Sequence, residues 1–246
     1  MKRILFLLYG VISYFIFFGT FLYAIGFVGN LFVPKSIDGA ATMPLAKAVL
    51  LNASLLLVFA LQHSIMARPA FKRWWTKFVP EPAERSTYVL LASLCLLLMM
   101  WQWQPIGGVV WSIESSLFKT ILLSTYAFGW GLVLISTFLI NHFDLFGLRQ
   151  TWLYVTGRQY RQLPFRTPLF YRFVRHPLYL GFLIAFWSTP IMTVAHLLFA
   201  ILTTGYILTA IIFEEKDLAA QFGESYIMYK QNSSKIIPFL KRNNKR

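Results

Sequence analysis

The chain has 246 residues, of which 57 % are apolar and only 13 % are charged, with a formal net charge of +14. Because a soluble domain carries about 25 % charged residues, this composition excludes an ordinary soluble globular protein. The mean hydropathy of +0.59 indicates that most apolar side chains face lipid, and the single cysteine, Cys95, excludes an intrachain disulfide and a cysteine-based metal site.

Charge-free stretches predict the membrane spans, because an ionised side chain at mid-bilayer costs at least a few kcal/mol. The first four stretches each suit one helix and cover residues 4–34, 48–67, 86–113 and 120–143. The fifth, 177–213, is too long for one crossing and holds Thr189-Pro190 near its middle, so we expect a hairpin of two helices there. Its first arm, about 177–189, is short enough to stop within the bilayer. The predicted fold is an all-α, polytopic transmembrane bundle of five to six spans.

The basic residues predict the orientation of these spans. With the N-terminus in the cytoplasm, 20 of the 23 Lys and Arg residues face inward, in segments 1–3, 68–85, 144–176 and 214–246. This distribution follows the positive-inside rule and predicts a multi-pass protein with both termini cytoplasmic. We expect the membrane to be a bacterial inner membrane. Topology therefore accounts for the net charge, and we expect no nucleic-acid partner and no obligate protein partner.

Polar side chains of opposite charge flank the fifth stretch. The segment 144–176 carries six arginines against one acidic residue, and the tail that follows the hairpin begins with two glutamates. In a hairpin these two ends meet on the cytoplasmic side, where a ligand with an anionic and a cationic end would fit. The residues nearest the hairpin are Arg175, His176, Pro177, Glu214 and Glu215.

Each end of such a ligand has a partner in this pattern. Pro177 at the first helical position leaves free amides that suit a carboxylate or phosphate, and Arg175 adds a forked hydrogen bond. Either Glu214 or Glu215 can neutralise an ammonium or sulfonium. Aromatic faces for a cation come from Tyr179, Trp187 and Tyr206. The alternative is that these residues only anchor helix ends at the lipid headgroups.

Two groups of motifs carry a family resemblance. The stretch YRFVRHPLYLGFLIAFW, a hairpin, a paired Glu and FGESYIMY follow the pattern RHPxYxG…EE…FGxxYxxY, which resembles the C-terminal half of the isoprenylcysteine carboxyl methyltransferase superfamily. The stretches LQHSIMARPAFKRWW, ERSTYV and INHFDLFGLRQ resemble the methanethiol S-methyltransferases within it. Together these motifs extend the resemblance over most of the chain.

The resemblance implies S-adenosylmethionine as cofactor. It also implies one integral-membrane domain, 1–246, with a four-span region 1–143 and a cofactor-binding region 144–246. The chain has no GxGxxG in a βαβ unit, which excludes a Rossmann-type methyltransferase. Gly181 suits a close approach of the ligand or of a neighbouring helix. Residues of the superfamily motifs that contact the cofactor carry over to Arg175, His176, Pro177, Tyr179, Gly181, Glu214 and Glu215.

The implied reaction is methylation of a small thiol, methanethiol to dimethyl sulfide. Two alternatives stay open: methylation of a prenylcysteine carboxylate or a phospholipid amine, and a non-catalytic membrane accessory protein of nitrogen-oxide metabolism. The clustering of ionisable residues at one membrane face argues against a transporter.

A thiol acceptor needs help to ionise, and His142 is our candidate base. We expect an extended break in the chain there, which lets Asp144 orient the imidazole. Asn141, Arg149 and His63 are the candidate substrate-binding residues, although a histidine within a span is more often bonded between helices. The alternative is that His142 and Asp144 only mark the membrane interface.

A last pattern follows the paired Glu. Leu218, Phe222, Tyr226 and Tyr229 recur at helical spacing, which predicts one amphipathic helix that lies on the membrane and caps the cofactor.

Overall fold

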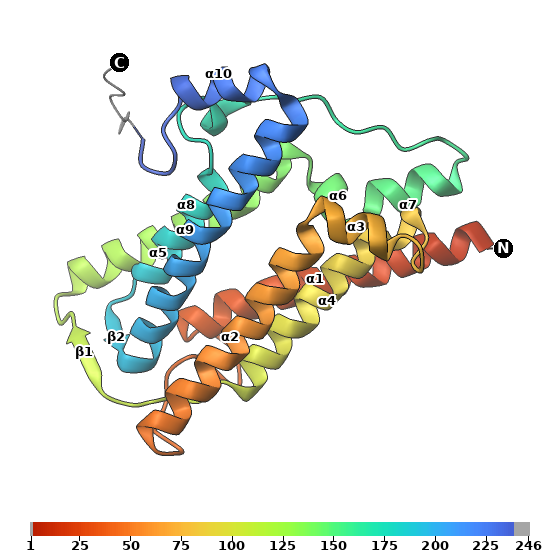
Figure 1. Ribbon diagram of the computed structural model, residues 1–246. Helices are drawn as coiled ribbons and strands as arrows, with labels where there is room; N and C mark the ends of the chain where they lie inside the picture. The colour runs from red at the N-terminus through yellow and green to blue at the C-terminus, as the bar shows by residue number, and fades with distance from the viewer. Residues whose placement is uncertain (1, 239–246) are drawn as a thin grey trace. The chain divides into compact units, whose positions relative to one another are not determined.

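The structure is a computed structural model, and residues 2–238 of it are described here (Figure 1). The chain divides into two compact units that interleave along the sequence. Unit 1 holds the residues up to Ser112, then His142–Arg161 and Ile191–Leu202. Unit 2 holds Ile113–Asn141, Gln162–Pro190 and the residues from Thr203 onward.

Five helices are long and apolar enough to cross a membrane: α1 (Lys2–Gly29), α2 (Leu45–Ala67), α4 (Glu81–Gln102), α5 (Ser116–Ile140) and α9 (Val194–Phe222). Each of the first four predicted spans overlaps one of these helices, which begins two to five residues before the charge-free stretch, so the four spans are confirmed with earlier starts. Many of their large apolar side chains are exposed, as a lipid-facing surface requires. The chain is therefore a polytopic, mostly helical membrane protein.

The predicted hairpin is confirmed, with a short first arm. α8 (Pro177–Trp187) has 11 residues, about 16 Å of helix, and cannot cross a hydrocarbon core of about 30 Å. It ends before the predicted break at Thr189-Pro190, and the chain continues as strand β2 (Ile191–Thr193) into α9. The second arm is longer than expected, because α9 continues past residue 213 to Phe222.

Unit 1 is built on the packing of α1 and α2 against α4. Near the start of α1, Gly10 lies against Thr151 of α7 (Leu148–Val155), where a Cβ would come within 2.7 Å of the threonine hydroxyl. This places residues 142–161 beside α1 and α4 within unit 1. The division into regions 1–143 and 144–246 expected from the sequence stays a prediction.

The two ends of unit 1 differ in structure. At one end β1 (Val109–Ser112) pairs antiparallel with β2, and the Trp103 indole donates to the carbonyl of Ile37. The other end carries three short helices, α3 (Pro69–Trp75), α6 (His142–Leu145) and α7. We call this second end, with the loop 76–80, the α3 end (Figure 1).

Unit 2 is built on the packing of α5 along α8. Gly129 and Gly181 face each other there, and a Cβ on Gly181 would lie 2.7 Å from the carbonyl oxygen of Gly129. A 3-10 turn, η1 (Leu169–Arg172), precedes α8, and α10 (Glu224–Asn232) follows α9. The close backbone contact fixes α8 against α5, and with it the position of the first turn of α8.

The single amphipathic helix expected near residues 218–229 is wrong. α9 ends at Phe222, Gly223 has a φ of +56°, and α10 begins at Glu224. A positive φ cannot continue a right-handed helix, so the pattern of apolar residues is divided between two helices.

Candidate functional site

The first turn of α8 is attached to the segment that follows α10. Val174 and Ser234 form an isolated parallel bridge, in which the Arg175 amide donates to the Ser234 carbonyl at 2.9 Å. The His176 amide donates to the Lys235 carbonyl at 3.2 Å, and Pro177 then occupies the first helical position. The RHP motif is therefore held by main-chain bonds to Ser234 and Lys235, which follow α10.

Arg175 binds oxygens of the protein itself. Its Nε donates to Glu215 Oε1 at 2.8 Å, and its Nη1 donates to the main-chain carbonyls of Lys230 and Ser233. The side chain is only 8 % exposed. The guanidinium therefore joins α8, α9 and α10 within unit 2, and its expected forked bond to a ligand carboxylate stays a prediction.

Glu215 is the centre of a closed ionic cluster. Its side chain is 4 % exposed, and Oε1 lies 2.8 Å from Arg175 Nε and 3.3 Å from His176 Nε2. The second oxygen, Oε2, lies 3.0 Å from Lys230 Nζ. Sequence reasoning missed Lys230, because the break at Gly223 separates it from Glu215 in helical register. We call Arg175, His176, Glu215 and Lys230 the closed cluster.

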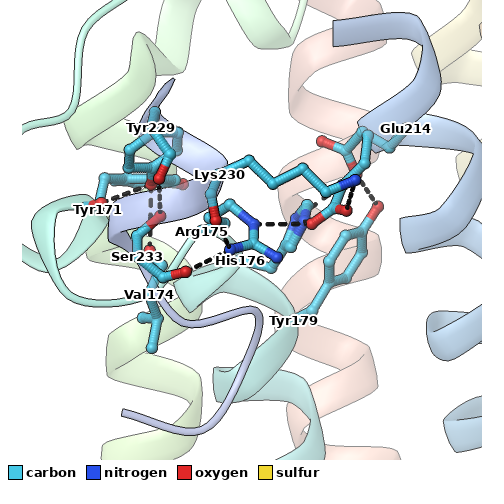
Figure 2. A network of polar contacts seen from close by, with 10 residues as sticks. Tyr171, Val174, Arg175, His176, Tyr179, Glu214, Tyr229, Lys230 and Ser233 are labelled. Atoms are coloured by element: carbon cyan, nitrogen blue, oxygen red, sulfur yellow. Dashed lines mark hydrogen bonds and ion pairs between the residues drawn. The ribbon is translucent and has the colours of Figure 1, made fainter. Parts of the chain in front are cut away.

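Glu214, the adjacent residue, has a different environment. Its side chain is 40 % exposed, Oε2 accepts a 2.8 Å hydrogen bond from Tyr179, and His176 Nδ1 lies 4.0 Å away. Among the described residues no donor bonds its other oxygen, Oε1. Of the two glutamates, Glu214 is therefore the carboxylate with an oxygen left for a ligand (Figure 2).

The remaining predicted cofactor residues differ in position. Tyr179 reaches the paired Glu as just described, whereas Gly181 is turned to α5 and its missing side chain allows that helix contact. Tyr206 is half-buried in α9, eight residues before Glu214. Trp187 donates to Thr204 at 3.0 Å and so links the end of α8 to α9.

Tyrosines of α10 support the closed cluster. The Tyr229 hydroxyl donates to the carbonyls of Tyr171 and Val174, and burial raises the pKa of Tyr229 to about 12. Tyr226 is 1 % exposed and, in the described part of the chain, its hydroxyl has no partner; burial raises its pKa also. The FGxxYxxY motif thus holds α10 against η1 and against Val174, the residue before the RHP motif.

In unit 1, His142 is buried against α1. Its Nε2 lies 2.8 Å from the Tyr14 hydroxyl, and burial lowers the pKa of the imidazole. The extended break expected here is wrong, because residues from His142 to Leu145 form the helix α6. Tyr14 was missed by sequence reasoning, since 128 residues separate it from His142. The role of His142 as a base stays a prediction.

Asp144 pairs with arginine and tyrosine. Oδ1 lies 2.7 Å from Arg149 Nη1, and Oδ2 accepts a hydrogen bond from Tyr160 at 3.3 Å. Arg149 also lies over the Tyr160 ring and donates to the Arg161 carbonyl. Asn141 caps α5 at the end of its segment of unit 2, with its amide bonded to Thr137.

The α3 end of unit 1 contains residues of three stretches singled out in the sequence, LQHSIMARPAFKRWW, ERSTYV and INHFDLFGLRQ. The Tyr88 hydroxyl lies 3.0 Å from the His63 ring nitrogens, and the Arg85 guanidinium lies over the Tyr88 ring. Arg85 Nε donates to the Leu145 carbonyl at 2.7 Å. Residues of all three stretches, namely His63, Arg85 with Tyr88, and Leu145, therefore lie together in unit 1, which separate motifs in the sequence did not predict.

Comparison with known proteins identifies close relatives over the whole chain. A methanethiol S-methyltransferase of Crocosphaera subtropica is 55 % identical over 98 % of this chain and 94 % of its own length. One from Mycobacterium tuberculosis is 52 % identical over 97 % of this chain and 98 % of its own. A more distant relative, Nurim of Sus scrofa, is 29 % identical over 74 % of this chain and 70 % of its own.

No family model and no solved structure matches the chain. The first two relatives match nearly the full length of this chain at 55 % and 52 % identity, and the five apolar helices agree with a membrane protein. The chain therefore belongs to the methanethiol S-methyltransferase family of membrane proteins.

Proposed function

We propose that this protein transfers the methyl group of S-adenosylmethionine to methanethiol and releases dimethyl sulfide. The observation that carries the proposal is Glu214, a half-exposed carboxylate with an oxygen to spare, beside the uncapped first turn of α8 in unit 2. The family supplies the acceptor, because the relatives at 52–55 % identity are named for methanethiol.

The donor's charges have matching groups in unit 2. Among the described residues no side chain caps the first turn of α8, so its amides after Pro177 are available to a carboxylate. Glu214 can accept from an ammonium or neutralise a sulfonium, and the Tyr179 ring beside it offers a face to a cation. These residues therefore fit S-adenosylmethionine, which supplies a methyl group on a positively charged sulfur when bound.

The acceptor must react as a thiolate. Its sulfur attacks the methyl carbon in line, a new carbon–sulfur bond forms as the bond to the sulfonium breaks, and the electron pair stays on the departing sulfur. Opposite charges cancel in this step, so a dry site favours it. A membrane location suits a small apolar acceptor and an apolar product, which partition into lipid.

The proposed orientation places both termini in the cytoplasm of a bacterium, in its inner membrane. It is supported by the distribution of basic residues and by the hairpin, because Tyr179 in the first turns of α8 bonds Glu214 in the last turns of α9. The two ends of the hairpin thus lie on one side, the side from which a charged, water-soluble donor would enter.

The direct test uses purified protein in detergent with S-adenosylmethionine carrying a labelled methyl group. Addition of methanethiol should give labelled dimethyl sulfide in the headspace, and Glu214→Gln should weaken donor binding while Lys216→Gln, an exposed neighbour, should not. Label in lipid but not in dimethyl sulfide would make a phospholipid the acceptor. Absence of both transfer and donor binding would favour a non-catalytic accessory protein.

A further inference from the structure

Helix α3 presents two chemically different faces. Arg73, Trp74, Lys77 and Phe78 in and just after α3 are exposed. Lys72 and Trp75 are half-buried, and Trp75 packs against the apolar cluster of Met66, Tyr88 and Val89. Because residues three apart share a helix face, Lys72 lies on the same inward face as Trp75.

Lys72 has an unusual electrostatic environment. Arg85 and Glu84 of α4, Arg68 before α3 and Asp144 of α6 all act on its ammonium. Burial, and then the charge of Arg85, lowers the pKa of Lys72, whereas Glu84 and Asp144 raise it by less. Asp144 is itself engaged by Arg149 and Tyr160, so positive charge exceeds negative charge here.

Two donors on this inward face have no acceptor among residues 2–238. The Lys72 ammonium forms no hydrogen bond or ion pair there, and the buried Trp75 indole nitrogen has no partner. The buried indole nitrogen without an acceptor costs free energy, typically about 1–3 kcal/mol, and the ammonium of the half-buried Lys72 is left without a paired anion. The inward face of α3 therefore lacks an anionic or electron-rich partner.

We infer that Lys72, Trp75 and Arg85 form an anion site in unit 1 that binds the acceptor as its thiolate. The walls suit a small, soft anion, because the aromatic rings of Phe71 and Phe146 also pack against the Met66–Tyr88–Val89 cluster. A lipid phosphate would instead find Arg73 and Lys77 on the exposed face of this segment.

Such a site would favour the ionised form of the acceptor thiol at neutral pH. Simple alkyl thiols are weaker acids than cysteine, whose pKa is about 8.5, so at neutral pH the free thiol is mostly protonated. Excess positive charge beside the sulfur favours the thiolate, and the proton passes to solvent when the thiol binds. This inference rests on the proposed function, and it gives the thiol a site within unit 1.

Calorimetry without any methyl donor tests the site. Methanethiol is titrated into the detergent-purified protein near pH 7 in two buffers with different heats of ionisation, which reports the protons released on binding. Wild type, Arg73→Met and Lys72→Arg should each release close to one proton. Lys72→Met should bind about tenfold more weakly and release none, since one unit of thiol pKa corresponds to tenfold.

Two controls separate the possible failures. Lys72→Met should unfold at the same or a higher temperature than wild type, because an unpaired charge on a half-buried side chain has been removed, so weaker binding cannot be attributed to misfolding. Thiol binding without proton release, or equal binding by Lys72→Met and wild type, overturns the inference. If labelled dimethyl sulfide still forms, only this inference fails; if neither binding nor product is seen, the proposed function fails with it.

Discussion

The two units each contain a cluster of ionisable residues, and the clusters differ in how completely their charges are matched. In unit 2, Glu215 bonds Arg175, His176 and Lys230, and the buried charges balance locally. In unit 1, the charges of Arg68, Arg85, Glu84 and Asp144 act on Lys72, but neither carboxylate forms an ion pair with it within the described chain. An ionic cluster whose charges are all paired holds helices together, whereas an unpaired charge on a half-buried face is available to a ligand.

The same contrast separates the adjacent glutamates. Glu215 has no oxygen to spare, and it joins α9 to α8 and α10. Glu214 keeps one oxygen and is substantially exposed. Consecutive helical residues diverge by about 100°, which allows one to face the cluster and the other to face a ligand.

The largest expected effect comes from breaking the closed cluster. Glu215→Gln removes the carboxylate charge that pairs with Arg175 and Lys230, and it should cost about 3–5 kcal/mol of unfolding free energy, because it leaves the buried Arg175 uncompensated. Glu214→Gln, one residue away, should cost less than about 1 kcal/mol. Unfolding in detergent, followed by intrinsic fluorescence, gives both numbers. Equal losses for the two variants would refute the division between closed and open carboxylates.

A second variant tests whether α8 is held by its contact with α5. Gly181→Ala places a Cβ 2.7 Å from the Gly129 carbonyl and 2.9 Å from the Val133 amide, and backbone atoms cannot move aside cheaply. The expected cost is about 1–3 kcal/mol. Gly131→Ala is the matched control, because nothing lies within 4 Å of its Cβ and alanine is the better helix former.

Gly181 also discriminates between the two interpretations made from the sequence. If this glycine instead leaves room for the cofactor, Gly181→Ala would weaken donor binding while the unfolding free energy stays at the wild-type value. Calorimetry with S-adenosylmethionine beside the unfolding measurement distinguishes the two outcomes.

The smallest expected effect concerns the hydroxyl groups of α10. Tyr229→Phe removes a donor to two carbonyls and should cost about 1 kcal/mol below pH 10. Burial raises the pKa of Tyr229 to about 12 from an unfolded value near 10, so the folded state binds more protons between these values and stability falls as pH rises through them. The variant should lose less stability than wild type over this interval.

Tyr226→Phe is the control for this prediction, because the Tyr226 hydroxyl has no partner in the described chain. It should be neutral or slightly stabilising at pH 8. Thermal unfolding between pH 8 and 11 measures both variants, and a steeper alkaline loss in Tyr229→Phe than in wild type would contradict the assignment.

The spans were predictable because lipid imposes a simple rule on charged residues. Each of the first four charge-free stretches overlaps one long helix, and α8 ends at Trp187, just before Thr189-Pro190. The local structure after each span was not predictable in this way. Residues 142–145 form a helix rather than an extended break, because α6 packs with α7 beside α1 and α4.

The site was predictable in composition but not in its bonding. The sequence placed Arg175, His176, Glu214 and Glu215 near one another, yet spacing could not say which glutamate the arginine would take. Lys230 contacts Glu215 from 15 residues away, beyond the helix break at Gly223. Tyr14 contacts His142 from 128 residues away. Such pairings arise from tertiary packing, which local periodicity does not encode.

The most direct test of the division between donor and acceptor sites is a crossed measurement on two variants. Glu214→Gln and Lys72→Met are each assayed for the Kd of S-adenosylmethionine and for the KM of methanethiol. The account predicts that Glu214→Gln weakens only donor binding and that Lys72→Met raises only the thiol KM, by about tenfold. If both variants affect the same substrate, or each affects both equally, the assignment of the two clusters is contradicted.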